Sequence, residues 1–167
     1  MNFANVRNYL ALVGPECKEL DGIVGYYGEQ LVLLAQSLGL NSCWVGGTYK
    51  VVNRAYNVDL GQKLAAVVAL GYGASQGVPH RSKAPQEVAP GYDGAPEWFK
   101  RGVDAALLAP TALNQQKFSF SLDGEENDVL VVRASTKRGA FTQMDLGIAQ
   151  CHFEIGAGST PFIWTER

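Results

Sequence analysis

Two long stretches of the chain carry apolar residues at helical spacing. In residues 18–40 the apolar face consists of Tyr27, Leu31, Leu34, Ala35 and Leu38. This spacing predicts a long helix that Gly39 could end, and the breadth of the apolar face predicts a central position. In residues 143–158 the corresponding face consists of Met144, Ile148, Cys151 and Ile155. It predicts a second central helix.

Short apolar or alternating runs predict the strands. They lie at residues 9–13, 43–45, 63–72, 118–122 and 129–134. The run at 63–72 is almost continuously apolar, so we expect an interior strand there, and the polar residues 123–128 are typical of a hairpin turn. We also expect a short helix at 49–58 and an extended surface connection at 73–95, where proline and glycine gather.

A weak internal repeat links the two long helices. A shift of 117 residues places Leu31 over Ile148 and Leu34 over Cys151, and Trp44 and Trp164 follow the two helices. Any two amphipathic helices would share part of this match, but a half-repeat is what a chain of two lobes should show.

Residues 96–120 predict a helix, a polar turn and a strand. The helical face, formed by Trp98, Val103, Ala106 and Leu107, stops before Pro110. Thr111 and Asn114 follow, with side chains suited to capping a helix or to binding a polar group. The corner is therefore either a ligand-binding element or a capped helix end with no ligand.

Composition restricts the classes of partner. The chain has 167 residues, of which 47% are hydrophobic and 18% charged, as in a folded protein with one core. A formal charge of -2 gives no electrostatic reason to expect nucleic acid or an anionic membrane as a partner. No apolar run approaches the roughly 20 residues of a membrane helix, and the first residues do not resemble a secretory signal, so we expect a cytoplasmic protein.

The cysteines and histidines do not predict a metal site. Cys17, Cys43 and Cys151 lie far apart, so buried thiols are expected rather than disulfides or metal ligands. His152, close to the second long helix, is expected to be a packed core histidine. The sequence leaves two interpretations of Arg81 and Lys83 open: they could bind a phosphate, or they could belong to a solvated loop.

Four stretches resemble the FMN-dependent nitroreductase family. Residues 109–118, APTALNQQKF, resemble its A-P-S-x-x-N-x-Q-P-W signature, with Thr111, Lys117 and Phe118 as departures. Residues 28–47 and 65–83 also resemble the family. Residues 144–156, MDLGIAQCHFEIG, are similar to the M-D-x-G-I-A-x-x-H of its single-chain branch, in which two half-repeats form a pseudo-dimer.

The resemblance implies a nitroreductase-like α+β fold with an antiparallel or mixed sheet, central helices and two pseudo-equivalent halves. Residues 1–167 would form one domain. Residues 1–83 would be the latter part of the first half-repeat and residues 96–167 the second, linked by 84–95. The R-x-S-x-R with which the family binds the flavin phosphate has no counterpart before Tyr9, so the chain is expected to be truncated or to receive that segment from another chain.

The resemblance also implies a flavin site with no catalytic side chain, because the flavin N5 would carry the hydride. Trp44, Val45, Gly46 and Gly47 would lie along the isoalloxazine. Arg81 and Lys83 would hold the phosphate, and the flavin would be covered by Pro110, Thr111, Ala112 and Asn114. NAD(P)H would be the electron donor and a nitroaromatic or quinone-like molecule the acceptor, and a homodimer is possible. The alternatives are a flavin-binding or scaffold protein without turnover and a truncated product that folds only with a second copy.

Overall fold

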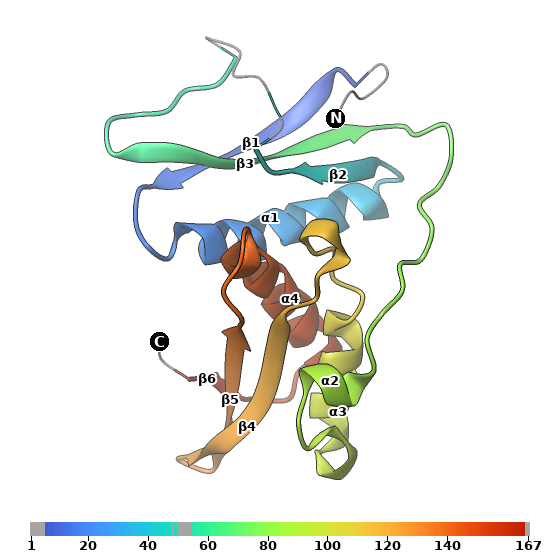
Figure 1. The fold of residues 1–167 in the computed structure, drawn as a ribbon, viewed down its shortest axis with the longest axis vertical. Helices are drawn as coiled ribbons and strands as arrows, with labels where there is room; N and C mark the ends of the chain where they lie inside the picture. Colours follow the sequence, from blue (N-terminus) through green and yellow to red (C-terminus); the bar gives the residue numbers. More distant parts are fainter. Residues whose placement is uncertain (1–5, 48, 50–54, 166–167) are drawn as a thin grey trace.

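A three-stranded antiparallel sheet is formed by the first half of the chain. Its strands are β1 (Asn8–Pro15), β2 (Asn41–Val45) and β3 (Gln62–Gly71), in the order β1-β3-β2. The computed structural model describes residues 6–47, 49 and 55–165 (Figure 1). Ala66, Val67, Val68 and Ala69 are all buried, so β3 is the interior strand that its sequence predicts.

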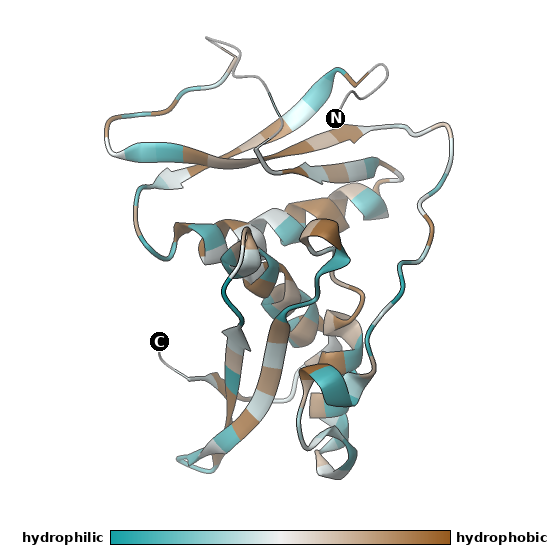
Figure 2. Cartoon of the chain, viewed as in Figure 1, coloured by the Kyte–Doolittle hydropathy of each residue, from teal (hydrophilic) through white to brown (hydrophobic). Residues whose placement is uncertain are grey.

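The second half of the chain forms a three-stranded mixed sheet. Its strands are β4 (Phe118–Glu126), β5 (Val129–Thr136) and β6 (Ile163–Trp164); β4 and β5 pair antiparallel, and β6 is parallel to β5. Figure 2 shows the alternation of hydrophobic and hydrophilic residues along β4, where Phe118 and Phe120 are buried. Asn127 and Asp128 have φ values of 50° and 62°, the left-handed pair that suits a tight hairpin.

Two long helices, α1 (Leu20–Ser37) and α4 (Thr142–Ala157), pack against each other between the sheets (Figure 1). Their backbones touch where they cross. A Cβ added at Gly25 would overlap the carbonyl of Met144, and one added at Gly147 would overlap the carbonyl of Gly22. Glycine is therefore required at this crossing, which joins the two halves of the chain.

The shorter helices complete the second half. They are α2 (Pro85–Val88), η1 (Tyr92–Gly94), α3 (Glu97–Ala106) and η2 (Ala112–Asn114). Phe99, Phe120 and Phe153 are fully buried and pack edge to face or tilted against one another and against the neighbouring Trp98, Phe162 and Trp164. This aromatic cluster is the centre of the core between α3, α4 and the second sheet.

The α+β class, the two long helices and the five expected strands are confirmed, with shifted ends. The extended connection expected at 73–95 is wrong in its second part, because residues 85–88 and 92–94 are helical and Val88 and Ala89 are fully buried. Of the helix expected at 49–58, residues 50–54 lie outside the described residues, and residues 55–58 are not helical.

The expected burial of α1 is confirmed for Ala35 and wrong for the other four residues of the predicted face. Tyr27, Leu31, Leu34 and Leu38 are 61%, 42%, 55% and 65% exposed, whereas Leu20, Val24 and Ala35 are buried. The helix buries the side on which its glycines let α4 approach. The hydrophobic pattern missed this side because glycine has no apolar side chain. Ile155 of α4 is likewise 61% exposed. Burial is confirmed only for Cys151 among the thiols, since Cys17 is exposed and Cys43 half-buried.

The two halves repeat one order of elements. The elements β1, α1 and β2 begin at residues 8, 20 and 41, and β5, α4 and β6 begin at 129, 142 and 163, which gives offsets of 121, 122 and 122 residues. The expected shift of 117 is 4 or 5 residues smaller than these offsets, so the weak match of the two apolar patterns did not give the correct register. No helix in the described part of the chain is long and apolar enough to cross a membrane.

Candidate functional site

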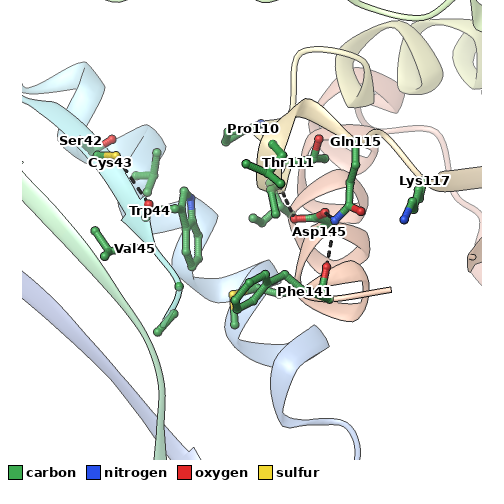
Figure 3. A pocket seen from close by; sticks show the side chains of 18 residues that line it. Ser42, Cys43, Trp44, Val45, Pro110, Thr111, Gln115, Lys117, Phe141 and Asp145 are labelled. Carbon is green, nitrogen blue, oxygen red and sulfur yellow. Dashed lines mark hydrogen bonds between the residues drawn. The ribbon is translucent and has the colours of Figure 1, made fainter. Parts of the chain in front are cut away.

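A cavity of about 700 Å³ lies between the end of β2, the corner after α3 and the first turns of α4. Trp44 and Val45 lie on one side of it and Pro110 and Thr111 on the other (Figure 3), and Gly46 and Ala112 also line it. The first turns of α4 contribute Phe141, Met144, Asp145 and Ile148. The walls thus come from segments more than sixty residues apart in the chain.

The structure brings six of the ten predicted site residues together around this cavity. Gly47 follows Gly46 but, like Asn114, Arg81 and Lys83, is not among the described residues that line it. Asn114 Nδ2 donates to the Arg81 carbonyl at 2.8 Å, and Lys83 Nζ donates to the Gln116 carbonyl at 2.6 Å. The polar groups of Asn114 and Lys83 therefore hold the backbone of the corner.

The corner itself has an unusual backbone. Leu113, Asn114 and Gln116 have positive φ values of 53°, 52° and 43°. Such angles are costly for residues other than glycine and persist only where neighbouring bonds hold them. Gln116, only 2% exposed, supplies several of these bonds: its backbone N–H donates to Thr111 Oγ1 at 3.1 Å, and its amide donates to the Arg81 carbonyl at 2.9 Å.

Asp145 is a site residue that the sequence did not assign. Its carboxylate accepts hydrogen bonds from the Ala112 N–H at 2.9 Å and from Gln115 Nε2 at 2.7 Å, so α4 holds the corner in place (Figure 3). Burial raises the pKa of Asp145, while these two hydrogen bonds and the charge of Lys117 act to lower it. The sequence feature that could have identified Asp145 is the Asp of the M-D-x-G-I-A stretch, but its role depends on Ala112, 33 residues away.

Two aromatic side chains border the cavity. The indole N–H of Trp44 donates to Glu29 Oε2 at 3.0 Å, which ties β2 to α1. Phe141 has a φ of 62° and packs against Gly46, where an added Cβ would lie 2.7 Å from the phenyl ring. A side chain at position 46 would therefore displace Phe141 from the end of the cavity.

The lining is mostly apolar, with a few polar groups from Thr111, Gln115, Lys117 and Asp145. Burial raises the pKa of the Cys43 thiol, which keeps it protonated and weakly nucleophilic. Among the described lining residues no histidine stands beside a nucleophile. The arrangement is suited to holding a flat, mainly apolar molecule rather than to nucleophilic catalysis by side chains.

Comparisons with known proteins agree with the fold. A family model described as "Putative TM nitroreductase" matches residues 1–157. The crystal structure of a protein from Thermotoga maritima, titled as a putative nitroreductase, matches with a TM-score of 0.63 and 20% sequence identity. The match covers 87% of this chain and 58% of that chain, so this chain spans less than two thirds of the length of that protein. A search of curated proteins found no match.

Proposed function

Because the chain belongs to the family described as "Putative TM nitroreductase", we propose that it is an FMN-dependent oxidoreductase. Electrons would pass from NAD(P)H to a nitroaromatic or quinone-like acceptor. The observation that carries this proposal is the cavity of about 700 Å³ between Trp44–Gly46 and Pro110–Ala112. Its volume falls within the roughly 300–1,000 Å³ of small-molecule and cofactor sites.

The residues of the cavity fit a flavin ring. Trp44 and Val45 offer an apolar wall, Gly46 leaves room for the ring of Phe141 at its end, and Thr111 and Gln115 offer polar groups at the opposite wall. When bound, FMN would supply hydride chemistry that these side chains lack. The protein would orient the ring, exclude water with its apolar lining and hold the covering corner through Asp145.

Arg81 and Lys83 are the proposed ligands of the FMN phosphate. They lie beside the corner, since Asn114 and Gln116 both donate to the Arg81 carbonyl. Arg81→Ala should weaken FMN binding by on the order of 1.5 to 3 kcal/mol, the value of a charge-assisted hydrogen bond. Titration of the apoprotein with FMN would measure this, with Lys63→Ala, an exposed cation on β3, as the control. An unchanged Kd for Arg81→Ala would remove Arg81 from the site.

Absorbance spectroscopy tests the proposed function. The purified chain, incubated with FMN and freed of excess by gel filtration, should retain flavin absorbance. Anaerobic addition of NADH or NADPH should bleach it, and a quinone or nitroaromatic should restore it. Retained FMN without bleaching would favour the alternative, a flavin-binding protein without turnover. The reason to consider this alternative is Lys117, which stands where the family signature has proline. A chain that retains no FMN contradicts both.

We also propose that residues 1–83 and 96–167 derive from two half-repeats joined by 84–95. The equal offsets of β1, α1 and β2 from β5, α4 and β6 support this division. A homodimer stays a proposal as well, and sedimentation at several protein concentrations would test it.

A further inference from the structure

Glu29 of α1 is a carboxylate buried in the core, with 1% of its surface exposed. Its Oε2 accepts the Trp44 indole N–H at 3.0 Å, and its Oε1 lies 2.9 Å from Nε2 of His152 on α4. Burial of an ionisable group is costly unless it is hydrogen-bonded. Trp44 and His152 together satisfy both oxygens of Glu29, so His152 is a hydrogen-bonding residue as well as a packed one.

Trp44 is held at two points. Glu29 fixes the indole N–H, and the six-membered ring lies directly on α1 at Gly28, where an added Cβ would overlap it. Trp44 also lines the cavity, with its side chain beside it (Figure 3). The orientation of this wall therefore depends on Glu29.

The other half of the chain contains an equivalent arrangement away from the cavity. Glu154 of α4 accepts the Trp164 indole N–H at 2.6 Å and the hydroxyl of Tyr26 on α1. Each glutamate thus binds the tryptophan of the strand after its own helix and a ring from the other helix. Trp164 is not among the described residues that line the cavity. The chain therefore supplies a matched control for the role of Glu29.

We propose that Glu29, supported by His152, is a positioning residue that fixes Trp44 as the wall against which a planar ligand binds. The part that concerns the ligand rests on the proposed function. The part that concerns Trp44 does not, because it follows from hydrogen bonds within the protein. Neither Glu29 nor His152 lines the cavity among the described residues, so both act through Trp44.

The first test compares Glu29→Leu with Glu154→Leu. Each variant removes the carboxylate that binds one indole N–H and one ring on the other long helix. We expect Glu29→Leu to raise the Kd of FMN about tenfold and Glu154→Leu to change it by less than about twofold. Glu29→Gln, which keeps an oxygen for the indole, should restore most of the affinity. Equal losses in Glu29→Leu and Glu154→Leu would overturn the proposal, because they would show general destabilisation.

The second test needs no ligand. The indole N–H resonance of Trp44, assigned by its absence in Trp44→Phe, should exchange slowly with water in the wild type and in Glu154→Leu but rapidly in Glu29→Leu. An unchanged Trp44 resonance in Glu29→Leu overturns the proposal. If the wild type binds no FMN, the proposed function fails while this measurement still decides the role of Glu29.

A second pair of variants covers the case in which Glu29→Leu does not fold. His152→Leu removes the support of Glu29, and Tyr26→Phe removes the corresponding bond to Glu154. We expect faster exchange of the Trp44 indole N–H in His152→Leu than in Tyr26→Phe. The same exchange rate in both would remove His152 from the proposal.

Discussion

Asp145 determines where the corner sits, although it belongs to a different element. It accepts two hydrogen bonds from residues 112 and 115, next to three residues in left-handed conformation. Such angles cost on the order of 1–3 kcal/mol each, so the corner needs this external support. The geometry of one wall of the cavity therefore depends on the Asp145 carboxylate together with the hydrogen bonds of Gln116.

Removal of this carboxylate should be costly. Asp145→Ala leaves the Ala112 N–H without its acceptor and the Gln115 amide with only the Ala140 carbonyl, and we expect a loss of about 2 kcal/mol in the free energy of unfolding, measured in urea. Asp123→Ala removes an exposed ion pair with Arg133 and should cost less than about 1 kcal/mol. Similar losses in the two variants would show that Asp145 does not support the corner.

The pH dependence of stability should report on the same group. Because the pKa of Asp145 is raised in the folded state, its protonated form favours folding below the pKa of the unfolded chain, and that contribution is lost as pH rises through the folded pKa. The stability of the wild type relative to Asp145→Asn should therefore fall as the pH is raised from about 4 to 7. Urea denaturation of both proteins at each pH measures this difference, and an opposite trend would contradict the raised pKa.

The crossing of α1 and α4 depends on contact between backbones. In Gly147→Ala the new methyl group meets the carbonyl of Gly22, and neither backbone can yield without separating the helices. We expect a loss of about 3 kcal/mol or more in the free energy of unfolding. Gly77→Ala, where the added Cβ meets nothing within 4 Å, is the control and should change stability by less than about 0.5 kcal/mol. A tolerated Gly147→Ala would mean that the helices can separate at little cost.

The sequence predicted which segments form helices and strands better than which faces they bury. The continuous apolar run of β3 could be identified because burial on both sides leaves every residue apolar. The buried side of α1 was missed because, besides Leu20, Val24 and Ala35, it consists of glycines and Glu29, which have no apolar side chain. The aliphatic residues Leu31 and Leu34 dominated the pattern instead.

Prediction of the cavity shows the same limit. Trp44, Val45 and Gly46 and residues 110–112 were named from the resemblance to the nitroreductase family, whose motifs are local in the sequence. The contributions of Asp145, Phe141 and Lys117 depend on how α4 and the corner meet in space. The spacing of residues along the sequence does not predict that contact.

The α1–α4 contact joins the two halves of the molecule, and residues 81–83 bind the corner within the second. The exposed residues 72–79 between β3 and this segment form no helix or strand. A protease site inserted between Gly77 and Val78 should therefore give two pieces that stay together in gel filtration after cleavage and melt in one transition. Separation of the pieces without denaturant would show that the connection, rather than the helix crossing, unites the halves.

Because the cavity walls come from distant segments, the order of synthesis also determines when a ligand can first bind. A polypeptide made from its amino terminus has Trp44 early, but it lacks Ile148 until 104 further residues have been added. Stable capture before then is excluded, because one side of the cavity does not yet exist. A ligand that binds here would stabilise, by mass action, only a chain that already includes α4.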